Sequence, residues 1–132
     1  MTSDTRPLSP HLQVYRRTYN MVLSVLLHRA AGVVLSAGFI ALTVWLAALA
    51  AGRASYAEFA ALAASTPGRI ALAGVAAAFW FHFCTGLRHL AFDTGRGLER
   101  HAARRSALVA VLAALVLTAL TLAAIFAPGG AA

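Results

Sequence analysis

Three long apolar runs, separated by shorter polar stretches, dominate the chain. Residues 30–51 and 106–127 contain no charged side chain, and another apolar run extends from Ile70 to about Leu90. At about 1.5 Å per residue, a helix of about 20 residues crosses the roughly 30 Å hydrocarbon core of a bilayer. The pattern therefore predicts an all-α membrane protein with three transmembrane helices, over about residues 22–51, 70–90 and 106–127.

The polar stretches lie between these predicted helices and before the first of them. Residues 1–20 are polar, contain two prolines, and are expected to form a non-helical arm or a short surface segment. Residues 52–69 are expected to form a loop, within which residues 56–64 form a short interfacial helix. Residues 91–105 are expected to form a charged loop. The first apolar run starts too late and is too long for a signal peptide.

Composition and charge narrow the class of protein further. Hydrophobic residues make up 61% of the chain and charged residues 11%, whereas about 25% of residues are charged in a soluble domain. All eleven basic residues are arginines, and the net charge is +7. So little soluble chain cannot form the basic face with interleaved aromatic residues that nucleic-acid binding needs. We therefore expect the lipid bilayer, and no nucleic acid, as a partner, and treat residues 1–132 as a single membrane-anchor domain.

The arginines are distributed unequally between the two ends of the predicted helices. One side carries only Arg53 and Arg69, and the other side carries the remaining nine. Cytoplasmic segments of membrane proteins are enriched in Lys and Arg, so this asymmetry predicts the N-terminus inside and the C-terminus outside. The residues on the inner side are Arg6, Arg16, Arg17, Arg29, Arg88, Arg96, Arg100, Arg104 and Arg105.

A histidine lies inside the second apolar run. Because a polar side chain is costly at membrane depth, His82 is a candidate functional residue. On a helix its face includes Val75, Ala78, Gly86 and His89. Ala78 and Gly86 have almost no side-chain bulk, so either a flat macrocycle or the backbone of another helix can lie against this strip.

Basic side chains are expected to gather at the inner ends of the first two helices. His28 and Arg29 come to the same level as Arg88 and His89, below the deeper His82. This arrangement suits a haem, with an imidazole on the iron and cations near the two propionates. In the alternative interpretation, His82 hydrogen-bonds a neighbouring carbonyl and the arginines extend to lipid headgroups. If the iron has two axial ligands, the second comes from another subunit, because this chain offers one histidine at that depth.

Three further side chains of reactive types are expected to take no part. Cys84 is the single cysteine and lies roughly opposite His82 on a helix, so we expect a small buried apolar residue. His11 lies in the polar arm and His101 in the charged loop, where both are expected to be solvated.

Two motifs resemble those of one known family. The segments RPLSPHLQVYR and SVLLHRAAG resemble the N-terminal signature of the cytochrome b subunit of succinate dehydrogenase, a subunit of respiratory complex II. The segment from His82 to Gly95, with the pattern H-x-x-x-G-L-R-H-L-x-F-D-x-G, resembles the second signature of that family. The resemblance covers about residues 6–126, including the number of spans and their topology.

The resemblance implies a haem b-binding anchor of a succinate:ubiquinone oxidoreductase in the bacterial inner membrane. The chain would be the larger of two small membrane anchors, which dock a flavoprotein subunit and an iron–sulfur subunit on the inner face. Electrons from succinate would reduce ubiquinone where the iron–sulfur subunit meets the anchors. The smaller anchor would share the haem b and supply its second histidine. The chain would have no catalytic activity alone.

The resemblance also implies roles for the residues at the haem. His82 would be one axial ligand of the iron. His28 would contact a propionate, and Arg88 and His89 belong to the same group of cofactor-binding candidates.

For the quinone, the resemblance implies that Arg29 is the cation at the head group. A cation there stabilises the negative charge that develops as the quinone is reduced. Asp93, at the inner end of the second span, is placed to pair with Arg29 or to relay protons. The alternative for Asp93 is a surface ion pair with Arg88 or Arg96.

The quinone-site serine departs from the family pattern. In the family two residues separate this serine from His-Arg, whereas three residues separate Ser24 from His28 here. On a regular helix Ser24 and Arg29 would point about 140° apart, against about 40° with the family spacing. Either the start of the helix is irregular, or Ser24 does not line the quinone site.

Two other classes of function are alternatives: a structural anchor without haem, and an unrelated small transporter or assembly protein. His82 argues against the first. Against the second, no predicted span contains an acidic residue, and none is interrupted in mid-membrane by Pro or paired Gly.

Overall fold

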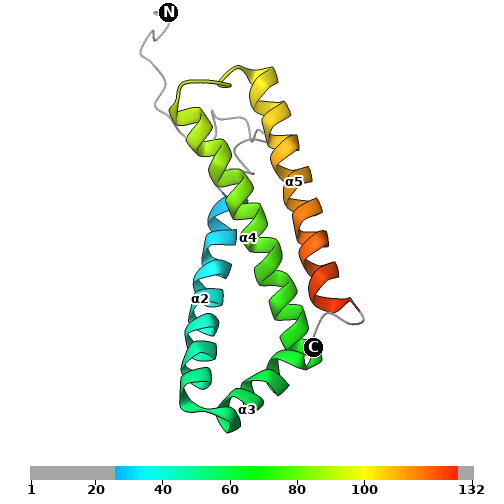
Figure 1. The fold of residues 1–132 in the computed structure, drawn as a ribbon. Helices are drawn as coiled ribbons and strands as arrows, with labels where there is room; N and C mark the ends of the chain where they lie inside the picture. The colour runs from blue at the N-terminus through cyan, green and yellow to red at the C-terminus, as the bar shows by residue number, and fades with distance from the viewer. Residues whose placement is uncertain (1–25, 128–132) are drawn as a thin grey trace, which may run out of the picture.

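The computed structural model describes residues 26–127, so the predicted arm lies outside the described residues. Across this part of the chain four helices follow one another and no strand occurs (Figure 1). Three of the helices are long and apolar enough to cross a membrane. The prediction of an all-α, multi-pass membrane protein with three spans is confirmed. The helices are α2 (His28–Ala51), α3 (Arg53–Ala64), α4 (Thr66–Asp93) and α5 (Arg100–Phe126), of which α3 is the short one.

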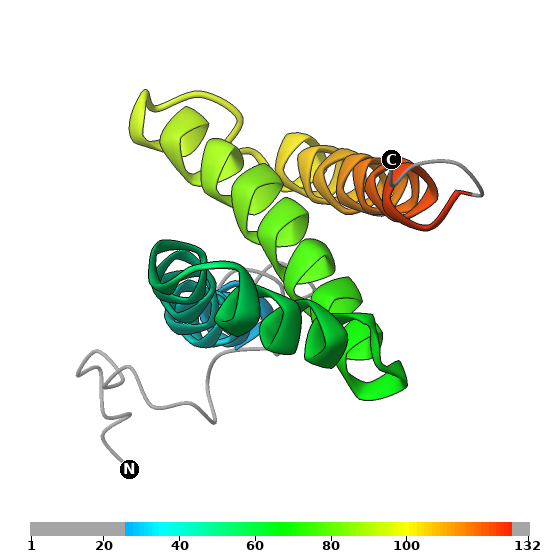
Figure 2. The ribbon, with the colours of Figure 1, turned by 60° about the horizontal axis from the view of Figure 1, so that its bottom comes forward.

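Helix α4 is the centre of the fold. It contacts α2, α3 and α5, and α2 and α5 lie on different sides of it (Figures 1 and 2). Helix α3 spans the space between the end of α2 and the start of α4 (Figure 1). Because each face of α4 meets a different neighbour, the direction of a side chain around α4 decides which helix it contacts.

The connection between α3 and α4 is tighter than the sequence predicts. The expected helix over residues 56–64 is present as α3 but starts three residues earlier, and Ser65 alone separates it from α4. The Ser65 hydroxyl accepts a hydrogen bond from the Gly68 N–H at 3.3 Å and donates one to the Leu62 carbonyl at 2.5 Å. Serine at an N-cap stabilises a helix start in this way. A Cβ at Gly68 would overlap the Leu62 carbonyl oxygen, so this corner requires glycine.

The charged loop after α4 is shorter than predicted. Helix α4 continues to Asp93 and α5 begins at Arg100, so the expected loop over residues 91–105 is reduced to residues 94–99. A charged side chain marks the end of the part of a helix that lies in the hydrocarbon core. The helix itself can continue, because Arg and Glu are good helix formers. Gly95 and Gly97 have φ values of 75° and 76° and turn the chain between the two helices.

Small side chains allow α5 to pack closely on α4. A stripe of buried alanines on α5 faces α4, and Cys84 is buried beside it, as expected for a small apolar residue. Further along, the Trp80 indole N–H donates a hydrogen bond to the Thr121 hydroxyl at 2.8 Å. One side of α4 is therefore occupied by α5. The buried alanines of α5 are Ala103, Ala107, Ala110 and Ala114.

Candidate functional site

Three of the predicted site histidines come together where α2 begins and α4 ends. The rings of His28 and His82 are stacked, with centroids 3.9 Å apart and planes inclined by 16°. The ring of His89 meets that of His28 edge-on at a centroid distance of 5.1 Å. We call these three imidazoles the histidine cluster. The sequence predicted His28 and His89 at one level below a deeper His82. His28 and His89 do meet, but the His28 ring is also stacked on that of His82, so the expectation that this chain offers one histidine at that depth is wrong.

A glycine on each of the two helices lies beside the ring of the opposite helix, and the approach is close at Gly32. A Cβ at Gly32 would lie 3.3 Å from His82 Cε1, and a Cβ at Gly86 would lie 3.9 Å from His28 Cε1. Each ring therefore lies near the glycine of the opposite helix. The two sites read His-x-x-x-Gly in the sequence, at residues 28–32 and 82–86, a repeated signal that the sequence analysis missed. Helix α2 packs beside α4 here, and its His28 side chain lies next to Gly86 of the small-residue strip.

The hydrogen bond of His82 fixes which of its nitrogens is free. Its Nδ1 lies 3.2 Å from the backbone carbonyl oxygen of His28. A carbonyl only accepts, so Nδ1 carries the proton and, in the neutral ring, Nε2 carries the lone pair. Metal-binding histidines typically have this arrangement, in which a backbone carbonyl orients the ring through the other nitrogen. The carbonyl bond offered above as an alternative to iron ligation is present, and it is compatible with ligation.

Thr85 is a residue of the site that the sequence analysis missed. Its side chain is 1% exposed, and its Oγ1 lies 2.7 Å from His28 Nδ1. The same hydroxyl contacts the Phe81 carbonyl at 2.6 Å. The signal available in the sequence was a threonine three residues after His82, a spacing that places the two on nearly the same face of a helix.

Arg88 does not join the histidine cluster but points towards α5. Its guanidinium donates to the Ser106 hydroxyl at 3.1 Å and to the Ala103 carbonyl at 3.2 Å. It also lies over the ring of Phe92, 4.4 Å from the centroid, and the residue is 6% exposed. In this arrangement Arg88 ties α4 to α5.

Two of the three predicted quinone residues belong to the described part of the chain. Arg29, in the first turn of α2, and Asp93, the last residue of α4, are both exposed. Leu26 and Leu27, directly before α2, have π-helical conformation, a local irregularity that is common at functional sites. It falls within the three residues that separate Ser24 from His28. Ser24 itself lies outside the described residues.

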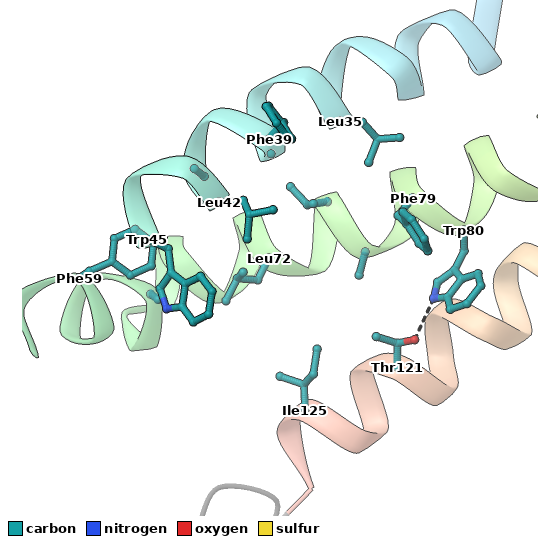
Figure 3. A pocket seen from close by; sticks show the side chains of 15 residues that line it. Leu35, Phe39, Leu42, Trp45, Phe59, Leu72, Phe79, Trp80, Thr121 and Ile125 are labelled. Atoms are coloured by element: carbon teal, nitrogen blue, oxygen red, sulfur yellow. Dashed lines mark hydrogen bonds between the residues drawn. The ribbon is translucent and has the colours of Figure 1, made fainter. Parts of the chain in front are cut away.

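An apolar cavity of about 890 Å³ lies nearer the other end of the helices (Figure 3). Side chains of all four helices line it, and none of the predicted site residues does. Thr121, hydrogen-bonded to Trp80, supplies one of its few polar groups (Figure 3). This cavity is suited to hydrocarbon and not to the charged groups of a haem or a quinone head. Its aromatic lining residues are Phe39, Trp45, Phe59, Phe79 and Trp80.

Comparison with known proteins identifies the family. The family described as succinate dehydrogenase/fumarate reductase transmembrane subunit matches residues 2–121. The chain is 40% identical over 121 residues to the succinate dehydrogenase cytochrome b556 subunit of Paracoccus denitrificans, covering 92% of each chain. It is 35% identical over 115 residues to the cytochrome b556 subunit of Rickettsia felis, covering 87% of this chain and 89% of that protein.

A mitochondrial relative matches over a similar length. The chain is 38% identical over 126 residues to the succinate dehydrogenase cytochrome b560 subunit of Bos taurus, covering 93% of this chain and 73% of that protein. The resemblance found in the two sequence motifs is confirmed by these matches. The chain therefore belongs to the family of transmembrane subunits of succinate dehydrogenase and fumarate reductase.

Proposed function

We propose that this chain is the haem b-binding membrane anchor of a succinate:ubiquinone oxidoreductase, with His82 as one axial ligand of the haem iron. Its relatives are named as cytochrome b subunits of succinate dehydrogenase. The observation that carries the proposal is the contact of His82 Nδ1 with the His28 carbonyl, which leaves Nε2 as a free ligand. A bound haem supplies a group that accepts and donates single electrons.

The remaining residues of the histidine cluster orient this ligand and hold the haem edge. The backbone of His28 fixes the tautomer of His82, and its ring supports one face of the His82 ring. We propose that His28 and His89 contact the haem propionates, because the ring of His28 lies against that of His82 and the ring of His89 lies against that of His28. If Arg88 also binds a propionate, its guanidinium would contact the propionate and the Ser106 hydroxyl at the same time.

The anchor would act together with other subunits. We propose that it docks a flavoprotein and an iron–sulfur subunit, and that a smaller anchor supplies the second haem ligand. Ubiquinone would be reduced at the end of the molecule that carries Arg29, whose exposed guanidinium is free to stabilise negative charge on a quinone oxygen. Ser24 and Asp93 are proposed as further quinone-site residues, with Asp93 pairing with Arg29 or relaying protons. The chain contributes sites and has no catalytic activity alone.

The spectrum of the purified complex tests this proposal. With a tag on this chain, the flavoprotein and iron–sulfur subunits are expected to copurify. The difference spectrum between the reduced and the oxidised complex is expected to show a b-type cytochrome. A complex that oxidises succinate but contains no haem would contradict the proposed cofactor, and would favour the structural anchor.

The protein is proposed to lie in the bacterial inner membrane with its N-terminus inside. The nine arginines on the predicted inner side, against Arg53 and Arg69 on the other, support this orientation. A reporter enzyme that works only outside the cytoplasm is therefore expected to be active when it is fused after Ala132. A reporter that works only in the cytoplasm is expected to be inactive at that position. The matching fusion within residues 94–99, between α4 and α5, is expected to give a cytoplasmic signal. A cytoplasmic signal from the C-terminal fusion contradicts the three-span orientation.

Gly32 and Gly86 offer a matched pair of variants that tests the packing of the histidine rings. In Gly32→Ala the new Cβ comes to 3.3 Å from His82 Cε1, closer than most real Cβ contacts, so the His82 ring must move. We expect a shifted haem spectrum and about tenfold weaker haem retention, as when groups that orient a metal ligand are disturbed.

In Gly86→Ala the new Cβ makes an ordinary contact of 3.9 Å with His28 Cε1. This variant is expected to retain haem as the wild type does, and both variants replace glycine by a better helix former. Haem content per flavin in the purified complexes gives the comparison. Equal haem content in the two variants contradicts this account of the packing.

A further inference from the structure

We infer that Thr85 is a positioning residue of the histidine cluster: its hydroxyl accepts a hydrogen bond from Nδ1 of His28 and holds the ring in one orientation. Nε2 of His28 is then left for the proposed propionate contact, in which it donates when it carries a proton as well. This inference rests on the proposed function only for its effect on haem. The contacts that carry it are within the chain itself. Thr85 is the largest side chain that is fully buried in the described part of the molecule.

The protons at Thr85 can be assigned from its three contacts. Oγ1 donates to the Phe81 carbonyl at 2.6 Å, and the His82 carbonyl is also close, at 3.2 Å. A hydroxyl has one proton and two lone pairs. With that proton on a carbonyl, Oγ1 is the acceptor in its 2.7 Å contact with His28 Nδ1. Nδ1 of His28 therefore carries the proton.

This bond also fixes His82 through His28. The ring of His28 is stacked on that of His82 at 3.9 Å, and the backbone carbonyl of His28 accepts the hydrogen bond from His82 Nδ1. If the ring of His28 turned over, the Thr85 hydroxyl, which is 1% exposed, would lose the donor to its lone pair, which is unfavourable for a buried polar group. Thr85 thus acts on the imidazole of His82, the proposed iron ligand, through the ring of His28.

A second threonine, Thr118, allows the role of Thr85 at His28 to be distinguished from the ordinary packing of a threonine in a helix. Thr118 donates from Oγ1 to the carbonyl four residues earlier, at 2.7 Å, just as Thr85 does. This hydrogen bond goes to the carbonyl of Ala114 on its own helix, α5, and not to an imidazole. Thr118→Val therefore removes a hydroxyl of the same geometry and serves as the matched control.

The experiment compares Thr85→Val, Thr85→Ser and Thr118→Val in the purified complex. Valine keeps the shape of threonine and removes the hydroxyl, and serine keeps the hydroxyl. We expect Thr85→Val to retain haem about tenfold less tightly, in the range seen when outer partners of metal ligands are lost, with an altered haem spectrum. Thr85→Ser and Thr118→Val are expected to match the wild type. Succinate oxidation with a soluble acceptor reports whether each complex has assembled.

A second measurement reads the tautomer directly. In complex labelled with [15N]histidine, the resonance of His28, identified by its loss in His28→Gln, is expected to show a protonated Nδ1 in the wild type and in Thr85→Ser. In Thr85→Val this preference is expected to be lost.

Several results overturn the inference. These are a Thr85→Val complex that matches the wild type, a Thr85→Ser complex that behaves like Thr85→Val, and a wild-type His28 protonated only at Nε2. A wild-type complex without haem would instead refute the proposed function. In that case the nitrogen resonances still decide the role of Thr85.

Discussion

Replacement of His82 by alanine is expected to abolish the b-type absorption of the purified complex, or to shift it strongly, with loss of most of the bound haem. Alanine removes Nε2, the nitrogen left free by the contact of Nδ1 with the His28 carbonyl. Loss of one axial ligand changes the coordination of the iron, and therefore its absorption in the reduced state. The measurement is the difference spectrum between the reduced and the oxidised complex, scaled to flavin content.

The control for this experiment is another histidine of the same chain. His101 is exposed in the first turn of α5 and takes no part in the histidine cluster. The His101→Ala complex is expected to keep the wild-type spectrum. An unchanged reduced spectrum in His82→Ala would rule out His82 as the ligand.

Replacement of Arg29 by alanine is expected to lower ubiquinone reduction by about 100-fold, the usual effect of removing one group that stabilises a developing anion. Succinate oxidation with an artificial soluble acceptor should continue, because those electrons need not pass through the quinone site. Arg29 is exposed in the first turn of α2, so its loss leaves no cavity in the packing. The two activities are measured on the same purified complex.

Arg53 provides the matched control for Arg29. It is also an exposed arginine in the first turn of a helix, but it lies at the opposite end of α2, at the start of α3. Arg53→Ala is expected to leave both activities unchanged. If Arg29→Ala loses both activities equally, the complex has failed to assemble and the quinone assignment is not supported.

The membrane spans could be predicted from the sequence because hydrocarbon excludes charge over the whole length of a helix. The apolar runs at residues 30–51, 70–90 and 106–127 fall within α2, α4 and, apart from its final residue, α5. The ends of the helices could not be predicted in the same way. Charged residues mark where hydrocarbon ends, but a helix can continue through them into the headgroup region, as α5 does at Arg104 and Arg105.

The level of the site could be predicted, but not the direction of each side chain. Depth in the membrane follows from the position along the helix, so His28 and His89 were expected at one level, with His82 deeper. His28 and His89 do meet, but the ring of His28 also reaches that of His82. Direction depends on which helix packs on which face, and successive residues differ by about 100°. Arg88 is adjacent to His89 in the sequence and therefore faces α5, where Ser106 binds it.

The structure of the assembled complex is the most direct test of the central claim, that His82 binds haem iron. We expect His82 Nε2 on the iron of a porphyrin that is shared with a second anchor. Its Nδ1 should still be bound to the His28 carbonyl. An assembled complex in which His82 contacts only lipid or apolar side chains, with no porphyrin beside it, would contradict the account.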